Sequence, residues 1–179
     1  MSIDMFLDPD DDPRTDPPTR VGERATLEAF LRWQRDTLAL KCSGLDAADL
    51  ARRAVEPSTL SLLGLVRHLA EVERSWFRRV MAGQDAPPYF YSDADPDGDF
   101  DGAAADPALV DRAWEAWRSE VAFAERLVAD APDLEVTGQH RHQGPVSLRW
   151  VLVHMIEEYA RHLGHADLLR QRIDGRVGQ

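Results

Sequence analysis

Apolar residues recur three and four positions apart in four long stretches of this chain, which is the spacing of one face of a helix. The stretches cover about residues 22–40, 61–83, 107–131 and 147–173. Residues that favour helix ends stand at their borders: Gly44 after the first, Ser58 or Ser61 before the second, Asp106-Pro107 before the third, Ser147 before the last and Gly175 after it. The pattern therefore predicts four long amphipathic helices.

The connections between these helices differ in length. Residues 46–50 have the composition of a short helical turn, and residues 134–145 predict a loop or a small hairpin. Between the second and third helices lies a run of roughly twenty residues, rich in aspartate, proline and glycine, which is too long for a tight turn between antiparallel neighbours. We therefore expect an all-α protein, a four-helix bundle in up-down-down-up order with a long crossover between helices 2 and 3.

Composition favours one soluble domain. The chain has 179 residues, of which 44% are hydrophobic and 30% charged, so it can bury one core of ordinary size. We expect the folded domain to cover residues 21–179. Residues 1–20 are rich in aspartate and proline, so we expect an extended, poorly ordered N-terminal segment.

Charge and cysteine content exclude several classes of function. A net charge of −11 repels phosphate backbones, so nucleic acid is not an expected partner. No stretch reaches the roughly 18 uninterrupted apolar residues of a membrane span, and no secretion signal opens the chain, so no membrane partner is expected. The single cysteine, Cys42, cannot form an intrachain disulfide, which is consistent with a cytoplasmic protein.

Four polar residues of the last helix fall on one narrow strip. At 100° per residue, His154, His162 and His165 all lie within about 40° of Glu158. Imidazole nitrogen and carboxylate oxygen suit a divalent metal such as Zn²⁺, Ni²⁺, Mn²⁺ or Fe²⁺, and Glu158 with His162 has the i, i+4 spacing at which one helix can hold one ion. The alternative is a polar seam in which Glu158 accepts hydrogen bonds from buried histidines. The last helix alone does not decide between them.

His68 is the candidate partner on a second helix. It follows Leu65 by three residues within an apolar stripe, so it is expected to face the interior. A lone histidine in such a stripe is more often a core residue with its hydrogen bonds satisfied. Ligands in a helical bundle converge when they point inward from facing helices, so His68 opposite Glu158 and His162 favours a metal site.

These residues resemble a known pattern. His68-Leu69-Ala70, together with Glu158 to Arg170, is similar to the DinB-like superfamily of metal-binding four-helix bundles, which includes mycothiol-dependent maleylpyruvate isomerase and bacillithiol transferase relatives. The resemblance covers about residues 22–175. Many members have histidine at the position of Glu158, whereas the isomerase-like branch has glutamate.

The resemblance implies His68, Glu158 and His162 as the metal ligands. It implies Zn²⁺ or Ni²⁺ as the metal, with Mn²⁺ or Fe²⁺ as alternatives. His154 and His165 are then neighbours on the cofactor-binding side that orient Glu158 or a bound water, although His165 is the residue that could replace a member of the triad.

Arg161 lies about 60° from Glu158 on the same helix. It is either a cofactor-binding residue that attracts an anionic group or a partner in a surface salt bridge. His140 and His142 have a His-x-His spacing but no third ligand near them in sequence, so they are expected to be exposed.

The resemblance also implies a function. It points to a metal-dependent enzyme that uses a low-molecular-weight thiol of the mycothiol type for transfer or isomerisation, with that thiol and an electrophile as small-molecule partners. The alternative is a non-catalytic metal-binding or dimerisation module. Members of the superfamily commonly pair through helical faces, so a homodimer is expected in either case.

Overall fold

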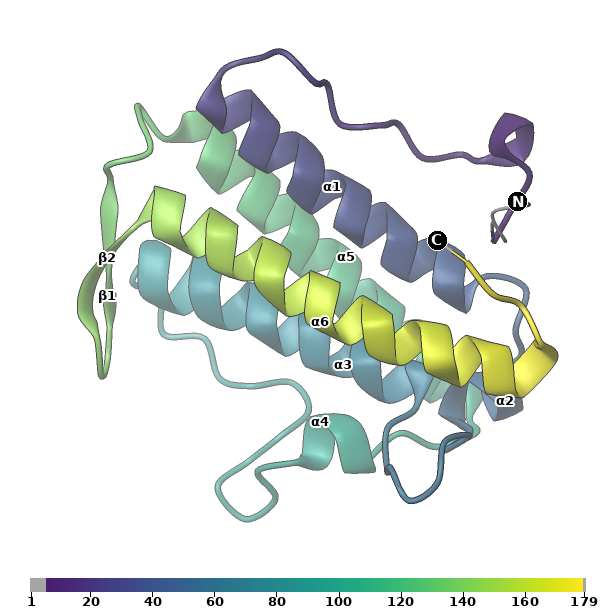
Figure 1. Cartoon of the computed structure of the whole chain (residues 1–179). Coiled ribbons are helices and arrows are strands. Elements are labelled where there is room, and N and C mark those ends of the chain that lie inside the picture. The colour runs from purple at the N-terminus through teal and green to yellow at the C-terminus, as the bar shows by residue number, and fades with distance from the viewer. Residues whose placement is uncertain (1–5, 179) are drawn as a thin grey trace.

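Four long helices dominate the computed structural model, which describes residues 6–178 (Figure 1). The helices are α1 (Glu23–Cys42), α3 (Leu62–Glu73) with its continuation η2 (Arg74–Met81), α5 (Pro107–Asp130) and α6 (Leu148–Asp174). Shorter elements are η1 (Pro9–Asp11), α2 (Ala47–Ala51), α4 (Gly98–Asp101), β1 (Thr137–His140) and β2 (Gly144–Ser147). The prediction of a mostly helical protein is confirmed.

The helices begin where the sequence places their caps. The Ser61 hydroxyl accepts from the amide of Gly64, and the Ser147 hydroxyl accepts from the amide of Trp150. The Asp106 carboxylate accepts from Ala108 N, directly before the proline that opens α5. Gly175 ends α6 in the left-handed conformation, with φ of 81°.

The second helix differs from a regular α-helix in its last part. Residues Arg74–Met81 form a π-helix, which changes the register of the side chains after Glu73. Apolar periodicity predicted one continuous α-helix to about Gly83, so this change was missed.

The region after α5 is a hairpin, one of the two forms that the sequence predicted. Strands β1 and β2 are antiparallel, with Thr137 opposite Ser147 and His140 opposite Gly144. A Cβ atom on Gly138 would lie 2.3 Å from the carbonyl oxygen of Val80, so only glycine lets the hairpin approach the π-helix this closely.

Helix packing places the core between the long helices. Helix α1 packs along α6, and α3 packs against both α5 and α6. The core is made largely of leucine, valine and alanine from all four, including the fully buried Leu38, Leu65, Ala124 and Leu152. None of the helices in the described part of the chain has the length and apolar composition needed to cross a membrane.

The N-terminal segment makes specific contacts, although the sequence predicted poorly ordered chain over residues 1–20. Phe6 is buried, with the ammonium of Lys41 4.4 Å from its ring centroid. The Arg14 guanidinium lies over Trp33 and donates to the Thr37 hydroxyl. Residues 1–5 of that prediction lie outside the described part of the chain.

Candidate metal centre

Two helices bring His68, Glu158 and His162 together. His68 comes from α3 and the other two from α6, and one potential ligand atom of each lies within 4.8 Å of the others. Nε2 of His162 is 3.6 Å from Oε2 of Glu158, and the ring centroids of His68 and His162 are 4.7 Å apart. Two imidazoles and a carboxylate from facing helices are a donor set suited to a divalent metal.

The three candidate ligands differ in how deeply they are buried. His162 is buried, and this desolvation, followed by the nearby charges of His68, His165 and Arg161, lowers its pKa to about 4. Its imidazole is therefore neutral at pH 7, the form that carries a free lone pair. The side chains of His68 and Glu158 keep 22% and 24% of their surface exposed, so the group is open to solvent on their side.

Asp99 forms a hydrogen bond with His68, a contact that was not predicted from the sequence. It lies on α4, in the long crossover, and its Oδ2 is 2.8 Å from Nδ1 of His68. The adjacent Phe100 stacks on the His68 ring, with centroids 4.4 Å apart. Nothing distinguishes Asp99 from the other aspartates of the crossover in sequence, because no periodicity links a loop residue to a helix that ended earlier in the chain.

The crossover is fastened to α3 and η2 along most of its length. Arginine side chains donate to its carbonyl groups: Arg67 to Gly98 and Asp99, Arg74 to Pro87, and Arg79 to Ala86. Glu71 accepts from the amides of Tyr89 and Phe90. The long connection is thus one wall of the site, and its position is set by the same helix that carries His68.

His154 and His165 contact the candidate ligands from outside the group. Nδ1 of His165 lies 3.4 Å from Nδ1 of His162. Nε2 of His154 lies 3.4 Å from Oε1 of Glu158, while its Nδ1 is 3.3 Å from Glu157. The structure thus places each of these histidines next to a candidate ligand, and their role in orienting it stays a prediction.

Arg161 lies on the exposed side of α6. Its side chain is 67% exposed, and its Nη2 lies 3.7 Å from Oε1 of Glu157, one turn earlier on α6. This contact is the surface salt bridge that the sequence offered as one alternative, and such exposed pairs contribute little to stability.

Aromatic rings continue the strip beyond His154. The His154 ring stacks on Trp150 and meets Trp76 edge to face, with centroid distances of 5.0 and 4.7 Å. His140, on strand β1, stacks on the other side of this cluster against Trp76. His142 is exposed, as the sequence predicts, whereas His140 is half-buried by this stacking, so the prediction of an exposed side chain is wrong for His140. Trp76 belongs to the π-helical part of this helix, η2.

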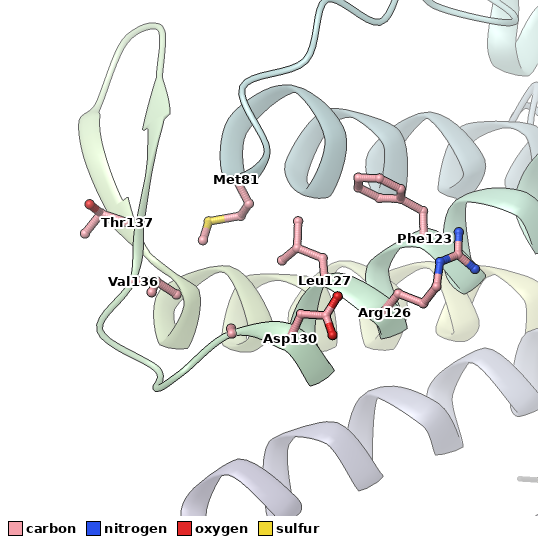
Figure 2. A pocket seen from close by; sticks show the side chains of 8 residues that line it. Met81, Phe123, Arg126, Leu127, Asp130, Val136 and Thr137 are labelled. Atoms are coloured by element: carbon pink, nitrogen blue, oxygen red, sulfur yellow. The ribbon is translucent and has the colours of Figure 1, made fainter.

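A separate pocket lies between the hairpin, η2 and the end of α5. It has a volume of about 440 Å³ and is lined by Met81, Phe123, Arg126, Leu127, Asp130, Ala131, Val136 and Thr137 (Figure 2). None of the candidate ligands lines it. The metal donors and this pocket are therefore distinct features of the surface.

Comparison with known proteins identifies the family. The family model described as mycothiol-S-transferase matches residues 26–175, which is most of the chain. The searches of curated proteins and of solved structures gave no match. The matched region contains all three candidate ligands and Asp99. The chain belongs to the mycothiol-S-transferase family, a member of the DinB-like superfamily that the residues around His68 and His162 resemble.

Proposed function

We propose that this protein is a metal-dependent enzyme that uses a low-molecular-weight thiol of the mycothiol type in a transfer or isomerisation reaction. The observation that carries the proposal is the convergence of His68, Glu158 and His162 from two helices, within a family described as mycothiol-S-transferase. Family membership supports the thiol, and the donor set supports the metal.

The residues fit a catalytic rather than a purely structural metal site. Three protein ligands leave coordination positions open, whereas structural zinc sites usually have four protein ligands. The mixture of nitrogen and oxygen donors suits Zn²⁺ or Ni²⁺, with Mn²⁺ or Fe²⁺ as alternatives. A metal bound here supplies a positive charge that lowers the pKa of a coordinated thiol and favours the thiolate.

The protein's own side chains have separate tasks in this proposal. His68, Glu158 and His162 hold the ion, while His165 and His154 orient two of them. The thiol enters from the solvent side of His68 and Glu158 and gives its proton to water there. In a transfer, its sulfur forms a bond to an electrophilic carbon, and the leaving group departs with the electron pair of the broken bond.

The arrangement of the helices supports the assignment of His68, Glu158 and His162 as metal ligands. We propose that the four long helices form an up-down-down-up bundle, with the crossover between α3 and α5 as its long connection. In Figure 1, α1 and α6 run in one direction and α3 and α5 run in the other. This arrangement places His68 and His162 on neighbouring helices that face each other.

Thiol binding and turnover test the function. Metal-loaded protein is titrated with mycothiol by calorimetry and then assayed with a panel of electrophiles. We expect thiol binding and turnover that both disappear in His162→Ala. His142→Ala is the matched control, because that histidine is exposed on the hairpin, and it should behave as the unmodified protein. Metal-loaded protein that neither binds thiol nor turns over would contradict the proposal.

A non-catalytic association module is the second candidate, and one observation favours it. Large apolar side chains are exposed on α1 and α6: Phe30, Trp150, Val153 and Leu168. Such residues can form the interface of a homodimer. Sedimentation equilibrium of the unmodified protein and of Val153→Asp tests this, and a monomer at all concentrations would contradict it.

A further inference from the structure

His68 is held from two directions by the crossover. Oδ2 of Asp99 lies 2.8 Å from Nδ1, and the Phe100 ring stacks on the imidazole face. A hydrogen bond at Nδ1 with an ionised carboxylate requires the proton to be on that nitrogen, because a carboxylate only accepts. Nε2 is then the nitrogen with the free electron pair.

Asp99 is itself held in place. Its Oδ1 accepts from the backbone amide of Phe100 at 2.9 Å, and its side chain is only 8% exposed. Arg67, the residue before His68, donates to the carbonyl oxygens of Gly98 and Asp99. The carboxylate is therefore fixed by backbone contacts and by the helix that carries the histidine.

We propose that Asp99 is a positioning residue of the metal centre, which keeps His68 in the Nδ1–H tautomer and leaves Nε2 for the metal. This inference rests on the proposed function, because it takes His68 as a ligand. Hydrogen bonds from ligating histidines to carboxylates fix the tautomer and the ring orientation in metal sites generally. A crossover residue 31 positions away in sequence thus completes the site.

Asp99→Asn is the informative substitution because the neighbouring amide fixes its outcome. The Phe100 N–H donates both to the Asp97 carbonyl and to Oδ1 of Asp99. An amino group at the Oδ1 position would set two donors against each other, so the oxygen of the new amide stays there and the amino group faces Nδ1 of His68. An amino group donates, so the imidazole must accept at Nδ1 and carry its proton on Nε2. The nitrogen meant for the metal is then blocked.

Metal affinity is the first readout. Zn²⁺ affinity is measured by competition with a chelator for the unmodified protein, Asp99→Asn and Asp101→Asn. We expect Asp99→Asn to weaken binding by about 10- to 100-fold. Asp101 is the matched control, because it lies on the same short helix but is exposed and pairs with Arg53. Its variant should bind within about twofold of the unmodified protein.

The tautomer of His68 is the second readout, measured on metal-free protein by ¹⁵N NMR at a pH at which the spectrum shows only one protonated ring nitrogen. We expect Nδ1–H in the unmodified protein and Nε2–H in Asp99→Asn. Weaker metal binding without a change of tautomer would contradict the inference, as would unchanged affinity. Unmodified protein that binds no metal would overturn the proposed function instead, while the tautomer measurement would still decide the role of Asp99.

Discussion

A buried ion pair at the centre of the core offers the sharpest prediction about stability. Arg35 of α1 donates through Nε and Nη2 to the two oxygens of Glu73 on α3, each at 2.7 Å. The Tyr159 hydroxyl of α6 donates to Glu73 and accepts from Nε1 of Trp117 on α5. One polar network therefore joins all four long helices.

Removing one partner leaves the other charge buried and unpaired. The Glu73 side chain has no exposed surface, and that of Arg35 is 6% exposed. For such pairs the loss is about 3–5 kcal/mol, which for a domain of this size lowers the melting temperature by about 6–20 °C. We therefore expect Arg35→Met to destabilise the protein by this amount.

Urea unfolding of metal-free protein, followed by circular dichroism, measures the effect. The control is Glu125→Gln, because Glu125 is an exposed partner of Arg35 at 3.9 Å and should contribute less than about 1 kcal/mol. A double variant, Arg35→Met with Glu73→Leu, should recover much of the loss, because no unpaired charge remains. The Tyr159 hydroxyl then lacks an acceptor, at a cost of about 1–3 kcal/mol. A loss below about 1 kcal/mol for Arg35→Met would refute this reasoning.

Three further predictions concern single residues. Burial raises the pKa of Cys42 to about 12, so an aromatic disulfide reagent at neutral pH should react with it only in urea-unfolded protein, and rapid reaction of the folded protein would contradict the burial. Gly138→Ala should destabilise the protein by about 1–3 kcal/mol in a thermal unfolding scan, because its Cβ would meet the backbone of Val80. Gly144→Ala is the control in the same scan, because Gly144 has open space around it but a φ of 75°, so this variant measures backbone strain without a clash. The hydrogen bond from Arg170 lowers the pKa of Asp174, so this carboxylate stabilises the folded state above the unfolded pKa of 3.8 and loses that contribution as pH falls below it. Asp174→Asn should therefore destabilise the protein at pH 7 but not at the lowest pH at which it still folds, and an equal effect at both would exclude the linkage.

Part of the site could be predicted from sequence because it obeys helical geometry. Glu158 and His162 lie one turn apart on α6, so local spacing alone places them side by side. His68 required a second argument, the apolar stripe of α3, together with the resemblance to a family. Helical spacing also placed His154 and His165 on the same face of α6, although it could not predict which ring nitrogen of each histidine contacts which neighbouring side chain.

The rest could not be predicted because it depends on contacts that leave no periodic signal. Asp99 reaches His68 from α4 in the crossover, and which aspartate of the crossover does so depends on how Arg67 holds this segment. Arg35 and Glu73 look like ordinary surface charges in sequence, and only the packed structure shows that they are buried together. The π-helix after Glu73 changes a register that apolar spacing cannot resolve.

The most direct test of the central claim is a count of bound metal. Protein purified without chelators is analysed by elemental analysis before and after loading with Zn²⁺ or Ni²⁺, for the unmodified chain, His162→Ala and His142→Ala. The account predicts about one metal ion per chain in the unmodified protein and in His142→Ala, and little or none in His162→Ala. An unchanged metal content in His162→Ala would contradict the assignment of His68, Glu158 and His162 as the metal centre.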